Sequence, residues 1–95
     1  MAPYNPPTNL SYAELDISKY DNRMILCMIG KGGKGFYGLT RKLKIAYLWW
    51  NQERKVIELW GTDFHLARNN GAVNRLREIC ENFDKNFVVI IPNDN

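Results

Sequence analysis

The stretch IGKGGKGFYGLTRKL, residues 29–43, joins a glycine-rich loop to an amphipathic segment. It holds five glycines together with Lys31, Lys34, Arg41 and Lys42. After the loop, apolar residues recur at spacings of three and four, at Phe36, Leu39 and Leu43, which places them on one face of a helix. A flexible, positively charged loop directly before a helix suits an anion, because helix N-terminal N–H groups and the helix dipole both favour negative charge.

The whole chain has the composition of one small folded domain. It has 95 residues, of which 45% are hydrophobic and 13% aromatic, and this favours a modest packed core over disorder. The formal net charge of +3 suits an anionic partner without requiring one. We find no signal peptide and no apolar run long enough to cross a membrane. We therefore expect an intracellular protein in a reducing compartment, cytoplasmic or nuclear.

Few residues offer metal or catalytic chemistry. Cys27 and Cys80 lie far apart without a C-x-x-C spacing and sit in apolar periodic segments, so we expect buried free thiols. His65 is the only histidine, and we expect a capping or surface residue rather than a ligand. The carboxylates show no paired spacing. The sequence therefore predicts no enzymatic activity, no metal site, no cofactor, no small-molecule substrate and no membrane contact.

Local patterns predict an α+β domain over residues 10–86. The expected elements are a strand at 13–18, a helix at 23–29 capped by Asp21 or Asn22, a helix after the glycine loop, strands at 44–50 and 56–61 that form a hairpin, and a helical pattern starting at Thr62 or Asp63. The NNG at 69–71 makes that pattern either one bent helix or a turn followed by a shorter helix. We expect residues 1–9 to form a disordered or loosely draped arm, and residues 87–95 a tail with a possible extra C-terminal strand.

The apolar stripe of that last helical pattern is expected to consist of Phe64, Ala67, Val73, Leu76, Ile79, Cys80 and Phe83.

Two nucleotide-binding interpretations of the glycine loop fit poorly. Gly30, Gly32 and Gly35 form a literal G-x-G-x-x-G, but the dinucleotide motif needs a preceding strand and a parallel βαβ unit. Here a short helix precedes the loop and a hairpin follows it. A Walker A phosphate loop also fails, because no Gly-Lys-Ser/Thr closes the loop at the required spacing.

An apolar residue followed by G-x-x-G between two short helices fits better. In MIGKGGKGFYGL, residues 28–39, Ile29 precedes the GKGG motif and two apolar positions of the next helix follow it. With six elements in matching order over residues 13–85, the chain resembles the K-homology (KH) domain family of eukaryotic type I. The resemblance implies a β-α-α-β-β-α fold, in which three helices pack on one face of a three-stranded antiparallel sheet. Gly35 and Gly38 depart from the family pattern, as does the NNG.

The resemblance also implies binding of about four unpaired nucleotides of single-stranded RNA, with single-stranded DNA as the alternative. The loop would clamp phosphates, bases would lie in an apolar groove completed by the strand at 45–49, and main-chain groups near Tyr47 together with Arg54 would contact base edges. The expected RNA-binding residues are Gly30, Lys31, Gly32, Gly33, Lys34, Ile25, Met28, Ile29, Phe36, Leu39, Lys42, Ile45, Tyr47 and Arg54.

The hairpin further predicts a protein contact. If alternate residues from Ile45 to Trp49 face the helices, then Leu48 and Trp50 face outward, beside Trp60. Such a face is more apolar than a monomer usually exposes, so we expect a homodimer or protein interface at Leu48, Trp50 and Trp60. Because one four-nucleotide site binds weakly, a dimer or larger ribonucleoprotein would add avidity. The alternative function is a KH-like protein-interaction or assembly module that uses this tryptophan-bearing face.

Overall fold

The computed structural model describes residues 3–67 and 71–87, which form three strands and four α-helices. In chain order the elements are β1 (Ser11–Asp16), α1 (Asn22–Ile29), a short 3-10 turn η1 (Lys31–Gly33), α2 (Lys34–Leu43), β2 (Tyr47–Asn51), β3 (Val56–Gly61), α3 (Asp63–Ala67) and α4 (Ala72–Asn86). The predicted α+β class is confirmed. The described residues contain four α-helices rather than the three expected, because the last helical pattern forms two separate helices, α3 and α4.

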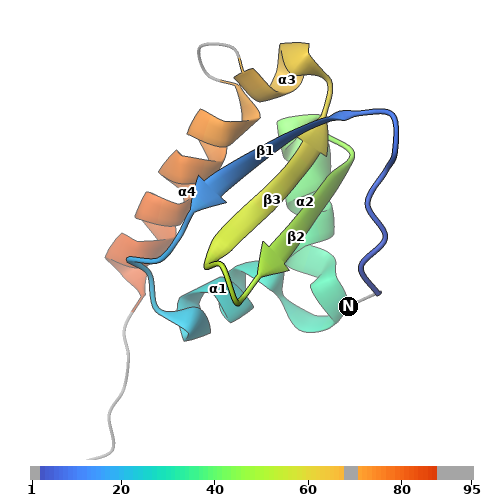
Figure 1. Cartoon of the computed structure of the whole chain (residues 1–95). Coiled ribbons are helices and arrows are strands. Elements are labelled where there is room, and N and C mark those ends of the chain that lie inside the picture. Colours follow the sequence, from blue (N-terminus) through green and yellow to red (C-terminus); the bar gives the residue numbers. More distant parts are fainter. Residues whose placement is uncertain (1–2, 68–70, 88–95) are drawn as a thin grey trace, which may run out of the picture.

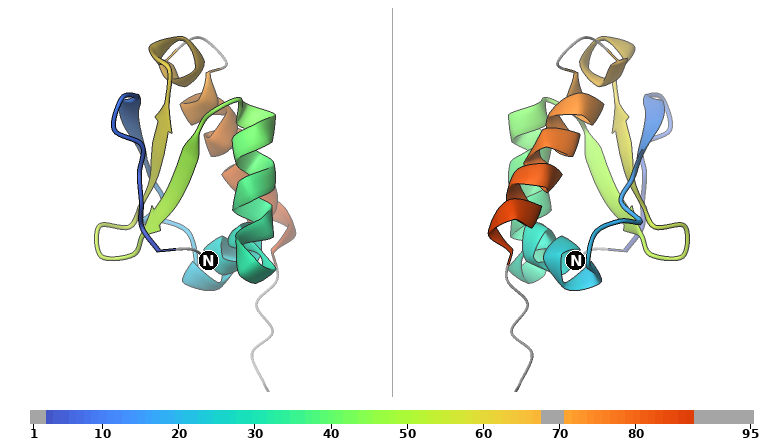
Figure 2. Two further views of the ribbon diagram at one scale, coloured as in Figure 1. Left: turned by 90° about the vertical axis from the view of Figure 1, so that its right-hand side faces the viewer. Right: turned by 90° about the vertical axis from the view of Figure 1, so that its left-hand side faces the viewer.

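The three strands form one antiparallel sheet in the order β1-β3-β2. The number of strands and their antiparallel direction agree with the sequence-based expectation. β3 is central, with Tyr12 of β1 and Tyr47 of β2 both opposite Trp60. Helices α1, α2 and α4 cover one face of the sheet, and α3 lies at one end of the strands (Figures 1 and 2). We call the opposite face of the sheet the outer face; the segment before β1 lies on this side.

Local capping explains where the helices begin and end. The Asp21 carboxylate accepts a hydrogen bond from the Arg23 N–H at 2.8 Å and caps α1, as predicted. α2 ends because Lys44 adopts a left-handed conformation with φ of 58°, and the Ile45 N–H bonds back to the Thr40 carbonyl at 3.0 Å. Residues 44 and 45 therefore belong to this helix end, whereas the Ala46 N–H already bonds to the Trp60 carbonyl of β3 at 2.9 Å. β2 starts at Tyr47, three residues later than the predicted strand.

The core lies between the sheet and the three covering helices. Its fully buried large side chains are Met24, Ile25, Leu43, Ile57, Leu59, Leu76 and Cys80. Burial raises the pKa of the Cys80 thiol to about 11, so this thiol stays protonated at neutral pH. Four expected core positions are wrong, because Cys27, Phe64, Ala67 and Phe83 are all exposed to solvent.

Both ends of the chain only partly fall within the described range. Residues 3–10 contain no helix or strand and lead from the outer side of the sheet into β1. Phe87 ends α4, and the rest of the predicted strand at 87–91 lies outside the described residues. In the described part of the chain, no helix combines the length and apolarity that crossing a membrane requires.

Candidate functional site

The glycine loop reverses the chain between α1 and α2 through three positive-φ residues. Gly30, Gly32 and Gly33 have φ of 74°, 65° and 83°, a region that residues with a Cβ seldom adopt. The Gly33 N–H donates to the Gly30 carbonyl at 3.1 Å, which closes the turn. No side chain accepts a hydrogen bond from the first turn of α2, and Lys31 and Lys34 project into solvent. The Gly33 and Lys34 N–H groups donate to the Gly30 and Lys31 carbonyls, so the loop presents mainly the two exposed ammonium groups, beside the positive end of the α2 dipole.

The chain around this loop is strongly positive. From Asn22 to Gln52 the sequence contains no Asp or Glu, although the whole chain has ten. The same stretch contains six cationic residues, namely Arg23, Lys31, Lys34, Arg41, Lys42 and Lys44. Arg23 pairs with Asp21 at 2.8 Å, and none of the other five forms an ion pair within residues 3–67 and 71–87. The overall charge of +3 is therefore unevenly distributed, and α1, the loop and α2 form a cationic segment.

A groove begins at the loop and runs between α2 and β2. One wall consists of Gly33, Phe36, Tyr37 and Thr40, and the other of Ala46, Tyr47, Leu48 and Trp49. Its volume is about 70 Å³, which is small beside the roughly 300–1,000 Å³ of typical small-molecule sites. β2 lies at the edge of the described sheet, so β3 bonds to only one side of it and main-chain groups on the other side face away from the sheet.

The predicted groove residues divide into two sets. Phe36 and Tyr47 line the groove, as does Gly33 of the loop. Ile25, Met28 and Ile29 do not form a wall, because all three are buried in the core below the loop. Leu39 and Ile45 are half-buried and pack against the core instead of lining the groove.

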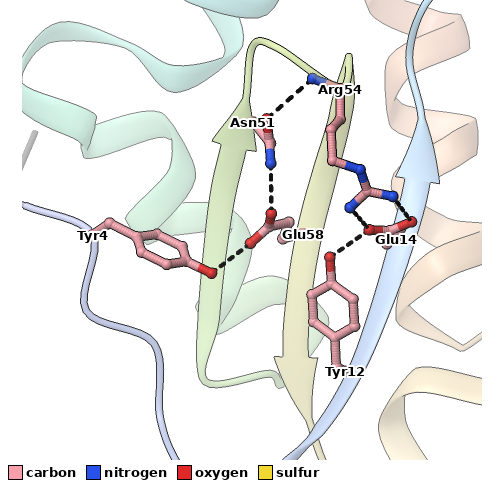
Figure 3. Close-up of polar contacts among 6 residues, drawn as sticks. All are labelled: Tyr4, Tyr12, Glu14, Asn51, Arg54 and Glu58. Carbon is pink, nitrogen blue, oxygen red and sulfur yellow. Dashed lines mark hydrogen bonds and ion pairs between the residues drawn. The ribbon is translucent and has the colours of Figure 1, made fainter.

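The two flanking cations have different surroundings. Lys42 is exposed in the last turn of α2, about 12 Å of helix rise from Lys34. Arg54 lies in the β2–β3 turn, but its guanidinium binds both carboxylate oxygens of Glu14 on β1, across β3 from β2 (Figure 3). Arg54, which we predicted to contact base edges, is therefore bound at the β1 edge of the sheet, whereas the groove lies at the β2 edge.

The predicted orientation of β2 is wrong by one residue. Leu48 and Trp50 point to the helix side and are buried, opposite Leu59 and Ile57 of β3. Tyr47 and Trp49 consequently lie on the outer face, with Trp60 of β3. Of the three predicted interface residues, only Trp60 is on the outer face, and its side chain is 8% exposed.

Tyr4 covers part of this outer face. Its ring centroid is 4.8 Å from that of Trp49 and 5.9 Å from that of Trp60. Its hydroxyl donates to the buried Glu58 carboxylate at 2.8 Å, and the Asn51 side-chain amide donates to the same carboxylate at 3.0 Å (Figure 3). Partial burial, together with this bond to Glu58, raises the pKa of Tyr4 to about 12.

Sequence reasoning missed three residues at or beside the groove. Tyr37 and Thr40 follow Gly33 by four and seven residues, which is the spacing of one helical face. This spacing could have predicted that both residues lie on the same side of the helix as Gly33. Tyr4 carried no such signal, because its segment shows no secondary-structure period and its partners Trp49 and Trp60 are 45 and 56 residues away in the chain.

Comparison with protein-family models, with curated proteins and with solved structures finds no match to this chain. Within the described ranges, no group of three His, Cys, Asp or Glu side chains is placed to hold a metal ion.

Proposed function

We propose that this chain is a KH-like domain that binds a short single-stranded segment of RNA, or alternatively of DNA. The observation that carries the proposal is one continuous surface. It starts at the uncapped N-terminus of α2 with Lys31 and Lys34, and Gly33 connects it directly to the groove between α2 and β2. A backbone phosphate at the loop would leave the attached base beside that groove.

The loop suits phosphate for a physical reason. Gly32 is exposed and has no Cβ, so an anion can approach the main chain there closely, next to the exposed Lys31 and beside the positive end of the α2 dipole. Lys31, Lys34 and Lys42 add positive charge along α2. The order of the elements and the position of the loop between two helices also support a KH-like arrangement.

Single-stranded nucleic acid fits this surface better than a duplex. The groove is short and apolar, and it would accept unpaired bases, whereas bases in a duplex are turned inward. Because one site of this size binds weakly, we include a dimer or larger ribonucleoprotein in the proposal. The assembly-module alternative is weaker, since Leu48 and Trp50 are core residues and Tyr4 packs over Trp60.

Fluorescence anisotropy with labelled random single-stranded RNA tests the proposal. We compare the wild type with Lys31→Ala/Lys34→Ala and with Lys31→Asp/Gly32→Asp, at two salt concentrations. The matched control is Lys19→Ala/Lys85→Ala, which removes the same charge at two exposed sites outside residues 22–52.

We expect salt-sensitive binding by the wild type and the control, with a loss of at least tenfold in both loop variants. A salt slope that falls by about 1–2 in log–log units after Lys31→Ala/Lys34→Ala would indicate two lost phosphate contacts. Equal binding by the loop variants and the control, or no binding by the wild type, would overturn the proposal.

A further inference from the structure

We propose that the outer face of the sheet binds a tyrosine in an extended, proline-containing segment of another protein, and that residues 3–7 of this chain occupy the same site as a built-in competitor. The site lies on the side of the sheet away from α1, α2 and α4 (Figure 2). Binding there would be independent of nucleic-acid binding, because the glycine loop joins α1 and α2 on the opposite side of the sheet.

Three aromatic rings of the sheet surround the side chain of Tyr4. Its ring centroid lies 4.8 Å from that of Trp49, 5.9 Å from that of Trp60 and 6.4 Å from that of Tyr47. All three contacts are edge to face, an arrangement that aromatic pairs favour. Tyr47 and Trp49 belong to β2 and Trp60 to β3, so the sheet itself provides a site for a tyrosine ring.

A buried carboxylate in this site accepts the tyrosine hydroxyl. Glu58 of β3 is 5% exposed, and one of its oxygens accepts the Tyr4 hydroxyl while the other accepts the Asn51 amide (Figure 3). A buried carboxylate is unfavourable unless it is hydrogen-bonded, so the site requires a donor at the first oxygen. A neutral tyrosine supplies that donor. Phenylalanine has no hydroxyl, and phosphotyrosine would bring negative charge to the carboxylate.

The segment that occupies the site lies on the sheet without joining the core. None of residues 3–10 is buried, and Tyr4 is 48% exposed. Among the described residues, two hydrogen bonds join this segment to the sheet, one from the Tyr4 hydroxyl and one from the Asn5 N–H. Its three prolines favour an extended chain, which lowers the entropy lost on docking. A segment held by these few contacts can be displaced by one that makes the same contacts and more.

The outer face extends beyond Tyr4, which identifies the competing segment as part of another protein. Tyr12 of β1 packs against Trp60 at 4.9 Å between ring centroids and is 45% exposed. A partner segment that also reaches Tyr12 would gain contacts there, because proline-rich chains dock on aromatic surfaces. A second copy of this chain would only replace each contact of residues 3–7 by an identical one, while association costs translational and rotational freedom.

The test is an NMR titration of the isotope-labelled full-length chain with the synthetic peptide APYNPPTN, which has the sequence of residues 2–9. The indole N–H signals of Trp49 and Trp60 report on the outer face, and that of Trp50, buried on the helix side, is the internal control. We compare the wild type with Tyr4→Ala and Tyr4→Phe. The matched control is Tyr37→Ala, which removes another exposed tyrosine on the helix side of the sheet. Circular dichroism verifies that each variant is folded.

We expect the peptide to shift the two outer signals in Tyr4→Ala and to leave Trp50 unchanged. The wild type and Tyr37→Ala should bind the peptide about tenfold more weakly than Tyr4→Ala, because their own Tyr4 fills the site. Tyr4→Phe should give an intermediate affinity, since its ring competes without the hydroxyl. Against Tyr4→Ala, a peptide with phenylalanine in place of tyrosine should bind about tenfold more weakly, and peptides with alanine or phosphotyrosine should not bind.

Two results would overturn the proposal. The first is a peptide that leaves the Trp49 and Trp60 signals of folded Tyr4→Ala and Tyr4→Phe unchanged, or that binds equally well with alanine in place of tyrosine. The second comes from analytical ultracentrifugation of the proteins without peptide. If the wild type is a dimer and Tyr4→Ala is a monomer, the occupant is the N-terminal segment of a second copy and not a segment of another protein.

Discussion

Gly35 of α2 lies directly against the carbonyl oxygen of Met28 near the end of α1. A Cβ at Gly35 would be 2.0 Å from that oxygen and 2.8 Å from the carbonyl oxygen of Ile29. Backbone atoms cannot rotate aside as a flexible side chain does, so this approach is possible only without a Cβ. Gly35 therefore sets how closely α2 packs on α1, and with it the tight turn of the glycine loop.

Replacing Gly35 with alanine should destabilise the protein. Alanine gains about 1 kcal/mol of helix propensity over glycine, but the clash forces α1 and α2 apart and costs more than this gain. We expect the free energy of unfolding to fall by about 2 kcal/mol, measured by urea denaturation followed by circular dichroism. A Gly35→Ala protein as stable as the wild type would show that the two helices separate without cost.

Gly38→Ala is the opposite case on the same helix. A Cβ at Gly38 meets no atom within 4 Å, so the substitution adds helix propensity without a clash. We expect a gain of up to about 1 kcal/mol in the free energy of unfolding, in the same urea experiment. A loss of stability would contradict the open surroundings of Gly38.

The sequence predicted the type and order of the elements well, because each depends on local signals. Asp21 caps α1 as predicted, and the strand at 56–61 forms as β3, Val56–Gly61. The error in β2 came from Ile45, which was assumed to share the alternation of Tyr47 and Trp49. Ile45 precedes the strand, and the left-handed Lys44 turns the chain before β2 starts, so its side chain carries no information about the strand's two faces.

The candidate site was only partly predictable for a similar reason. The glycine loop and its lysines are contiguous in sequence, and the structure keeps them together. The groove depends on how far α2 stands from β2, which a sequence pattern does not contain. The contact of Arg54 with Glu14 was not predictable either, because the two residues are 40 positions apart in the chain.

Arg54→Gln should raise the pKa of Glu14 toward its ordinary value of 4.5. Hydrogen bonds from Arg54, and to a lesser extent from Tyr12, hold this pKa below that value in the folded protein. A lowered folded-state pKa stabilises the protein above the unfolded-state pKa, and this contribution is lost as the pH falls through the folded-state pKa. The wild type should therefore lose more stability than the variant on acidification below about pH 4.5.

An NMR titration of the Glu14 side-chain carboxyl carbon measures this pKa directly.

In the anisotropy assay, Arg54→Gln should weaken nucleic-acid binding less than Lys34→Gln, because both remove one charge and only Lys34 adjoins the loop. If Arg54→Gln weakens binding more than Lys34→Gln does, Arg54 contacts the nucleic acid.

The contact of Tyr4 with the outer face should weaken in alkali. Burial first, and then hydrogen bonds to Glu58 and Glu14 respectively, raise the pKa of both Tyr4 and Tyr12 to about 12 from an ordinary value of 10.0. For a group whose folded-state pKa is raised, the stabilisation is complete below pH 10 and is lost as the pH rises toward 12. Urea denaturation should thus show falling stability over this interval, and phenolate absorbance should report the two late ionisations.

Tyr4→Phe separates the hydroxyl from the ring. The variant keeps a ring against Trp49 but cannot ionise or donate to Glu58, so its stability should be lower at neutral pH and should fall less between pH 10 and 12. Tyr12 remains in the variant and accounts for the residual dependence on pH. If Tyr4→Phe and the wild type lose stability in parallel over this interval, the Tyr4 hydroxyl does not hold the N-terminal segment on the outer face.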